Sequence, residues 1–437
     1  MSWFQIGLWS LPVLMLLIFL RMPIGLAMLV VGLAGTTLVT GSPAMVLARL
    51  KTETWSTFSS YSLSIVPLFL LMGQFATLGG MSRALFKAAE SWLGHRRGGI
   101  AMAAIGACAG FGSICGSSLA TAATMGQVAL PELRRYGYPG GLSTATLAAG
   151  GTLGILIPPS VVLVIYAILT EQNIARLFLA AFVPGLLAAV GYVIAIAIVM
   201  RRNPGQAALR ERVPYAGRLR AQLDIWPVLL VFLLVVGGIY LGWFTPTEAA
   251  AIGAFGTGLI ALLNGGLDRA SLGESILVTA GNTGMIFLIV LGAGFYNAFL
   301  ALTQVPQELS GFILEQGFNP WLVLALILVM YLALGCIMDS LSMVLLTIPI
   351  FFPIVSSLDY GLTPEETAIW FGILVLIVVE VGLITPPVGM NLFVINSMDD
   401  DTRIIDTYRA VTPFVISDIV RTIILVLFPG LTLFLLR

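Results

Sequence analysis

Glycine and hydroxyl-bearing residues interrupt the apolar sequence at 112–118, and a similar group at 150–154 comes shortly before a pair of prolines. Glycine lets the backbone turn and approach a ligand closely. Hydroxyl oxygens and freed backbone carbonyls are neutral ligands of the kind that coordinate sodium in membrane transporters. We therefore predict that the two segments clamp one cation. The residues of this first predicted site are Ser113, Gly116, Ser117, Ser118, Gly150, Gly151, Thr152 and Gly154.

A carboxylate occupies the comparable place in the second half of the chain, where Asp339 and Ser340 interrupt another apolar stretch. A charged residue inside such a stretch is costly and usually functional. We expect Asp339 and Ser340 to face Gly382 and Thr385 and to form a second cation site. Glu380 lies just before this region and could tune the site or bind a proton.

Both predicted sites have a structural alternative. Glycines four residues apart, such as Gly106 and Gly110 or Gly112 and Gly116, also fit close helix packing in membranes. Asp339 could instead cap the helix that follows it by accepting hydrogen bonds from free backbone N–H groups.

An internal repeat favours binding sites over packing alone. The segment 154–160, Gly-Ile-Leu-Ile-Pro-Pro-Ser, matches 382–388, Gly-Leu-Ile-Thr-Pro-Pro-Val, at an offset of 228 residues. A Pro-Pro pair removes two backbone donors and interrupts a helix. Paired interruptions at corresponding positions of two halves are the best sequence indication of a transporter's binding site.

The interrupted segments are predicted to form two re-entrant hairpins. Segment 98–134 starts and ends beside basic loops and breaks in its middle, at 112–118. Segment 319–359 breaks at 335–340, and both its ends are poor in Lys and Arg. Since basic loops stay on the cytoplasmic side of a membrane, one hairpin enters from each face and the two repeats are inverted in topology.

Composition places these segments in a membrane. Of 437 residues, 59% are hydrophobic and 10% are charged, and the mean hydropathy is +1.03. Soluble proteins carry about 25% charged residues, so a soluble enzyme is excluded. The length accommodates about a dozen hydrophobic segments. The formal net charge is zero, which gives no electrostatic reason to bind nucleic acid.

Catalytic chemistry lacks its usual groups. His95 is the one histidine, and it lies in a basic loop; the three cysteines have no metal-binding spacing. No HExxH or GxSxG string occurs. We therefore expect no enzyme, no cofactor and no transition metal.

The distribution of Lys and Arg predicts a multi-pass topology with a periplasmic N-terminus. The loops 83–97, 134–139 and 201–222 are basic and are assigned to the cytoplasm.

Long, ordered strings in both halves closely resemble one family, the large membrane subunit of tripartite ATP-independent periplasmic (TRAP) transporters. The likeness covers essentially the whole chain. The strings are Gly112-Ser-Ile-Cys-Gly-Ser-Ser-Leu-Ala120, Gly150-Gly-Thr-Leu-Gly-Ile-Leu-Ile-Pro-Pro-Ser160, Thr245-Pro-Thr-Glu-Ala249 and Glu380-Val-Gly-Leu-Ile-Thr-Pro-Pro-Val-Gly-Met-Asn391.

The resemblance implies a fold, partners and an activity. The fold would be an all-α, inverted-repeat elevator of the ion-transporter type, with two re-entrant hairpins and two broken helices, in the bacterial inner membrane. Its partners would be a small membrane subunit and a periplasmic substrate-binding protein. The activity would be sodium-driven import of a C4-dicarboxylate, sialic acid or related carboxylate. Carried onto this chain, the second cation site is Met338, Asp339, Ser340, Gly382 and Thr385.

Each part of the chain then has an expected role. Segments 98–173 and 319–402 form the moving transport domain, while 1–97, 174–318 and 403–437 form the scaffold. Half-helix N-termini near the midplane would hold the substrate carboxylate. The predicted anion site contains Ser117, Ser118, Pro158, Pro159, Thr385, Pro386 and Asn391. A stand-alone sodium- or proton-coupled symporter without a binding protein is the alternative.

Overall fold

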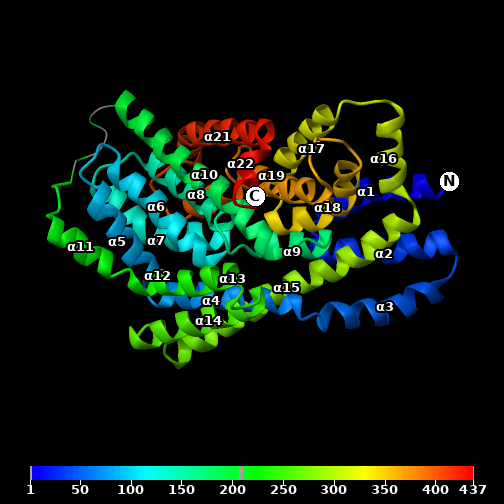
Figure 1. Ribbon diagram of the computed structural model, residues 1–437, viewed down its shortest axis with the longest axis horizontal. Coiled ribbons are helices and arrows are strands. Elements are labelled where there is room, and N and C mark those ends of the chain that lie inside the picture. The colour runs from blue at the N-terminus through cyan, green and yellow to red at the C-terminus, as the bar shows by residue number, and fades with distance from the viewer. Residues whose placement is uncertain (1, 204, 206–207, 209, 437) are drawn as a thin grey trace.

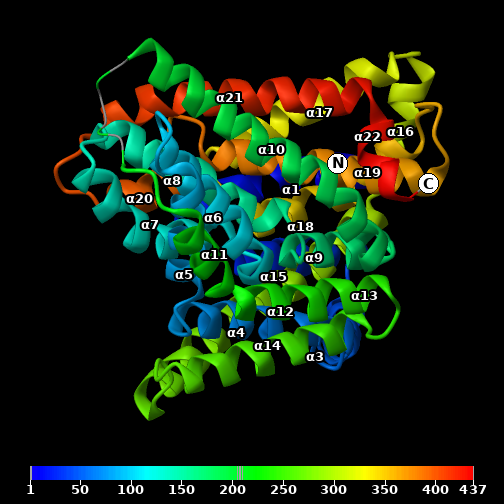
Figure 2. The same ribbon diagram turned by 60° about the vertical axis from the view of Figure 1, so that its left-hand side comes forward.

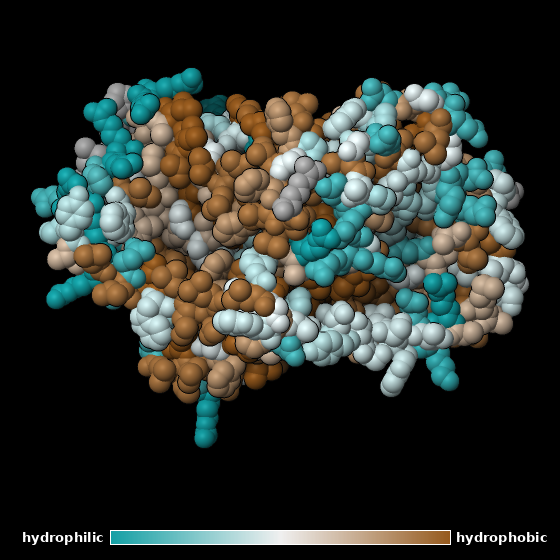
Figure 3. Space-filling model, viewed as in Figure 1, coloured by the Kyte–Doolittle hydropathy of each residue, from teal (hydrophilic) through white to brown (hydrophobic). Residues whose placement is uncertain are grey.

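The computed structural model describes residues 2–203, 205, 208 and 210–436, which form helices and, among these residues, no strands. Five described helices are long and apolar enough to cross a membrane, and up to eight spans result if each bent pair counts as one. In Figure 3, apolar side chains cover much of the surface between hydrophilic left and right edges. The multi-pass, all-helical class predicted from composition is therefore present.

One group of helices forms a layer along the lower part of Figure 1. Helix α2 packs along α15, and α4 packs along α14. The helices of the first and central parts of the chain are α1 (Trp3–Phe19), α2 (Ile24–Thr40), α3 (Pro43–Phe58), η1 (Ser62–Ser64), α4 (Ile65–Leu78), α5 (Met81–Leu93), α11 (Tyr215–Leu223), α12 (Trp226–Phe232), η2 (Leu233–Gly237), α13 (Gly238–Tyr240), α14 (Pro246–Leu263), α15 (Arg269–Leu302) and α16 (Val305–Glu315).

The helices of the two repeats form a body above this layer, and their order repeats. Each half has two hairpin helices, a broken helix and a long helix that contains a proline, Pro184 or Pro413. The first set is α6 (Gly99–Cys115), α7 (Ser118–Arg135), α8 (Gly140–Leu156), α9 (Val161–Thr170) and α10 (Ile174–Arg202). The second is α17 (Pro320–Gly335), α18 (Ser340–Ser356), α19 (Pro364–Leu383), α20 (Met390–Asn396) and α21 (Ile404–Leu427), followed by α22 (Pro429–Leu433) and η3 (Phe434–Leu436).

The hairpins break where the sequence predicts. Helix α6 ends at Cys115, Gly116 has a φ of 66° in the left-handed region, and Ser117 caps α7. Glycine adopts that conformation without steric cost. In the second hairpin, Asp339 caps α18. The first Pro-Pro pair separates α8 from α9, which are bent by 42°.

The basic loops assigned to one side of the membrane meet at one end of the molecule. Arg210 pairs with Glu90 at 2.6 Å, and the backbone N–H of Ala208 donates to the carbonyl of Tyr136. Arg134 also pairs with Asp399 there. Of the predicted cytoplasmic loop 201–222, residues 204, 206, 207 and 209 lie outside the described residues.

Acidic and polar loops meet at the opposite end of α10. Arg176, at the start of this helix, pairs with Glu365, and the hydroxyls of Ser310 and Ser357 lie 2.7 Å apart. A helix of 29 residues separates the two ends by about 43 Å. The first hairpin thus begins and ends at the basic end, the second begins and ends at the opposite one, and Figure 1 shows them approaching from left and right.

Helices α10 and α21 pack against each other and against α8 and α19 (Figure 2). The predicted boundaries assign both long helices to the scaffold, and that division stays a prediction. Their packing places them beside the broken helices and away from α2 and α14.

A glycine crossing repeats in the two halves. A Cβ atom added to Gly112 would lie 2.6 Å from the Cα atom of Gly154, and one added to Gly382 would lie 2.6 Å from the Cα atom of Gly335. Gly154 and Gly382 are the repeat-related residues at the offset of 228. Of the glycines for which close packing is the alternative, Gly112 makes such a contact and Gly106 does not. The two crossings bring each hairpin against its own broken helix.

We predict that Gly112→Ala destabilises the fold, because the backbone of α8 would have to move away from the added methyl group. Overpacking of this kind costs about 1–3 kcal/mol, which would lower the apparent melting temperature in detergent. Gly106→Ala in the same helix is the matched control, since its Cβ would meet only Ala89, at 3.9 Å. Equal melting temperatures for the two variants would contradict the tight crossing.

Candidate functional site

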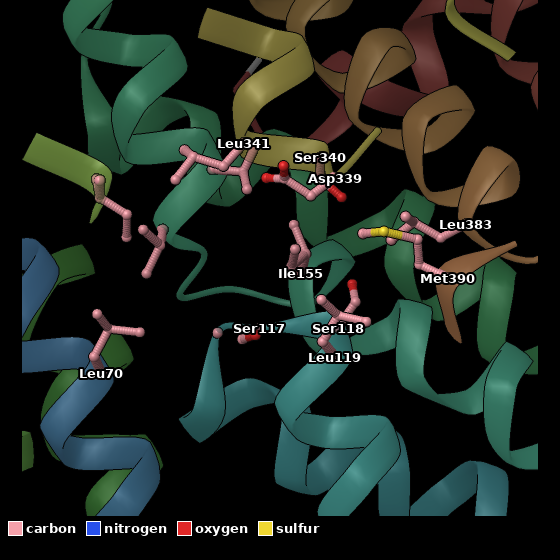
Figure 4. A pocket seen from close by; sticks show the side chains of 14 residues that line it. Leu70, Ser117, Ser118, Leu119, Ile155, Asp339, Ser340, Leu341, Leu383 and Met390 are labelled. Carbon is pink, nitrogen blue, oxygen red and sulfur yellow. The ribbon is translucent and has the colours of Figure 1, made fainter. Parts of the chain in front are cut away.

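The two hairpin tips line one cavity of about 110 Å³. Ser117 and Ser118 approach it from the first hairpin, and Asp339 and Ser340 approach it from the second (Figure 4). Leu70 of α4 and Ile286 of α15 contribute apolar surface from the lower layer. The cavity therefore lies between the hairpin body and the layer that it packs on, at the meeting point of the two repeats.

Two helix N-termini converge on this cavity. The Ser117 side chain accepts from the backbone N–H of Ala120 at 3.4 Å, and Asp339 accepts from that of Ser342 at 3.0 Å. The first turn of a helix carries unpaired N–H groups and a partial positive charge. This arrangement can hold an anionic group. The capping alternative for Asp339 is thus confirmed, and its half-buried carboxylate also borders the cavity.

Each tip touches the break of its own repeat, as the sequence predicts. A Cβ added at Gly154 would lie 2.7 Å from the Ser117 carbonyl oxygen, and one added at Gly116 would lie 3.1 Å from that of Pro159. In the second repeat, the N–H of Gly389 donates to the carbonyl of Cys336 at 3.2 Å. At each tip, backbone groups therefore lie close to the break of the same repeat.

Several predicted cation ligands use their hydroxyls elsewhere. Ser113 donates to Gly110 at 2.7 Å within α6, and Thr385 donates from the second break to Val381 of α19 at 2.6 Å. The hydroxyl of Thr152 donates to Ala149 and lies 2.9 Å from that of Tyr192. Ser118 and Ser340 differ, because their hydroxyls both reach Glu380. Met338 and Gly151 are buried beside the tips, and Gly150 is buried against Cys108 in the middle of α6; the oxygens that these residues offer are backbone oxygens.

The cavity contains only part of the predicted anion site. Ser117 and Ser118 line it. Pro158 and Pro159 are buried in the first break and do not border it. Thr385 and Pro386 lie in the second, more exposed break, also outside it. The amide of Asn391 is fully buried and donates to the carbonyl of Ala148 at 3.2 Å, so it joins the two repeats.

A buried polar network behind the first break was not predicted. Tyr192 donates to Asp418 at 2.7 Å, and Asp418 pairs with Arg421 at 2.9 Å. The sequence indicates the Asp418–Arg421 pair by its three-residue spacing, but the role of Tyr192 has no local signal. Through Thr152 the network connects α8 to the long helices α10 and α21.

A family model described as "Tripartite ATP-independent periplasmic transporter, DctM component" matches residues 11–431. The C4-dicarboxylate TRAP transporter large permease protein of Pseudomonas aeruginosa is 38% identical over 92% of each chain. The sialic acid TRAP transporter large permease protein of Vibrio cholerae is 30% identical over 96% of each chain. The solved structure of the Alcanivorax borkumensis YdaH transporter shares the fold, with a TM-score of 0.65, 13% identity and 89% coverage of each chain.

We predict that Asp339→Ala and Asp339→Asn differ in stability. Asparagine caps a helix about as well as aspartate, whereas alanine leaves the first N–H groups of α18 without their acceptor, at a cost of about 0.5–2 kcal/mol. Melting in detergent should therefore show a loss for the alanine variant and little change for the asparagine variant. Equal losses would mean that the charge, and not the cap, stabilises this tip.

Proposed function

Because the chain belongs to the tripartite ATP-independent periplasmic transporters, as their DctM component, we propose that it imports a small organic anion together with sodium. The family is one of transporter permease subunits and not of enzymes. The convergence of two capped hairpin tips on one cavity is the observation that carries the proposal. The substrate carboxylate would bind between the N-termini of α7 and α18, and sodium would bind where each tip meets its break.

A C4-dicarboxylate is the substrate class that we favour. The Pseudomonas aeruginosa relative is named for C4-dicarboxylates. Pockets for drug-sized ligands have volumes of about 300–1,000 Å³, whereas this cavity has about 110 Å³. A four-carbon acid needs far less rearrangement of the tips than sialic acid does.

The proposed mechanism is an elevator in which the hairpin body moves against the layer of α2, α4, α14 and α15. The location of the cavity on the boundary between these two parts supports it, since substrate would travel with one and slide past the other. The predicted boundaries put α10 and α21 in the scaffold, and we propose instead that both belong to the moving body, because they pack on α8 and α19. The matched glycine crossings and the opposed hairpins support an inverted repeat.

The proposed partners are a small membrane subunit, which would extend the stationary layer, and a periplasmic binding protein, which would deliver the anion. With these partners the chain would act in the bacterial inner membrane. We retain the predicted orientation, in which the basic end faces the cytoplasm.

We predict that liposomes containing the chain and its small subunit take up a C4-dicarboxylate only with both an inward sodium gradient and the binding protein. Replacing sodium by choline, and omitting the binding protein, are the two controls. Sialic acid is measured in parallel. Uptake with sodium but without the binding protein would instead establish a stand-alone symporter, and uptake without sodium would refute the cation sites.

Asp339→Asn should lower uptake at least tenfold while leaving the melting temperature nearly unchanged. The variant retains the helix cap but loses the negative charge at the cavity, which weakens cation binding at the second tip. Ser356→Ala is a matched control in the same helix, because the Ser356 hydroxyl is exposed and donates to Phe352 at the far end of α18. Full uptake by the Asp339→Asn variant would remove this carboxylate from the mechanism.

A further inference from the structure

Glu380 joins the two hairpins at the centre of the molecule. Its side chain is 1% exposed and lies on α19, within the second repeat. One carboxylate oxygen accepts from the hydroxyl of Ser340 at 2.8 Å, and the other accepts from the hydroxyl of Ser118. Ser118 is the first residue of α7 and Ser340 is the first residue of α18. A single side chain therefore contacts the same position of both tips.

These two hydrogen bonds fix the orientation of groups that border the cavity. Ser118 and Ser340 both line it. Each hydroxyl has one proton to donate and two lone pairs to offer. Because the protons are donated to Glu380, the lone pairs of both hydroxyls remain free on their other sides. Glu380 does not line the cavity. It orients the hydroxyl oxygens of Ser118 and Ser340, so that each tip offers one oxygen ligand to the cavity.

The arrangement occurs once and not twice. Glu380 stands 228 residues after Thr152, its counterpart in the first repeat. The hydroxyl of Thr152 contacts Tyr192 of α10 and neither hairpin tip. The repeat symmetry therefore fails at this position, and both tips depend on one shared carboxylate. If either tip moves, its hydrogen bond to Glu380 changes, and the other tip contacts the same carboxylate.

A charged or polar side chain in an apolar membrane segment is costly and is usually retained for function. Packing alone would be served equally well by an apolar residue at position 380, since the surrounding residues 373–384 are all buried. A carboxylate, in contrast, can accept one hydrogen bond from each hairpin and so connect the two hairpins, which enter from opposite ends.

We propose that Glu380 is a positioning residue that couples the two hairpin tips, so that cation binding at one tip strengthens binding at the other. This inference rests on the proposed sodium coupling. Coupled binding would close the cavity only when both sites are filled, which prevents the body from moving with one ion alone. The coupling free energy is reciprocal between the two sites.

A double-mutant cycle between the tips tests the coupling directly. Ser118→Ala, Ser340→Ala and the double variant are compared for the sodium concentration that gives half-maximal uptake. We expect the double variant to deviate about fivefold or more from the product of the single effects, as residues of one network do. In the Glu380→Gln background the deviation should fall below about twofold, because the amide nitrogen that replaces one carboxylate oxygen is a donor and cannot accept the proton of the hydroxyl beside it.

The Ser113–Ser340 cycle is the matched control. Ser113 lies in the same hairpin as Ser118, but its hydroxyl bonds to Gly110 in its own helix. The effects of Ser113→Ala and Ser340→Ala on the half-maximal sodium concentration should therefore multiply in the double variant, whatever the size of the Ser113→Ala effect. Glu380→Gln preserves side-chain volume, so a purely space-filling role predicts no change in either cycle. If this variant does not fold, the cycle in the native background still decides the question.

Thiol labelling supplies a readout that needs no transport. Cys115 lies at the first tip and Cys336 at the second, and both are buried. With Cys108→Ala and one of the other cysteines also replaced, the labelling rate reports the opening of a single tip. We expect sodium to protect both tips over the same concentration range in the native background, and over ranges at least about fivefold apart in Glu380→Gln.

The outcomes separate the two proposals. If sodium protects neither tip and drives no uptake, the proposed function fails. If sodium protects both tips, but the Ser118–Ser340 cycle is multiplicative and Glu380→Gln leaves the two ranges together, the coupling role of Glu380 is overturned and sodium transport stands.

Discussion

Each helix that stops inside an apolar region leaves backbone N–H and C=O groups that lipid cannot satisfy. The part of the chain that the structure describes contains four such stops in the two repeats, two at hairpin tips and two at proline breaks, and the tips and breaks satisfy one another's backbone groups. Ser117 and Asp339 cap the helices that restart at the tips. The carbonyl of Cys336 accepts from Gly389 in the second break. Interrupted helices are tolerated here because each tip is paired with a break.

That pairing requires close backbone contact, which explains the glycines. Gly112 against Gly154, and Gly335 against Gly382, leave no room for a side chain between the helices. These glycines therefore act as packing contacts, and they also bring the backbone of each tip close to the backbone of its break. A packing role and a binding role are compatible, since the contact is what creates the possible site.

Three buried charged groups, Glu380, Asp418 and Arg421, lie where the repeats meet. Glu380 contacts both hairpins, and the Tyr192–Asp418–Arg421 network lies behind the first break. Burial of such groups is costly unless they are hydrogen-bonded. Asp418 and Arg421 pair within α21, but Ser118 of α7 and Tyr192 of α10 come from the first half, so the cost is fully offset only when both halves are assembled. The polar groups thus specify how the two repeats fit together more than they stabilise either one.

The sequence by itself determined the helical membrane class, the positions of the breaks and the pairing of the repeats. Those features depend on local chemistry: apolar composition, glycine and proline at helix ends, and hydroxyl or carboxylate caps such as Asp339. Only the tertiary structure decided which way side chains point. It directed the hydroxyl of Thr152 to Tyr192 and that of Ser118 to Glu380, and it left Asn391, Pro158 and Thr385 outside the cavity. The hydrogen-bond partners of Thr152 and Ser118 lie 40 and 262 residues away in the sequence. No local sequence pattern encodes a contact across that separation.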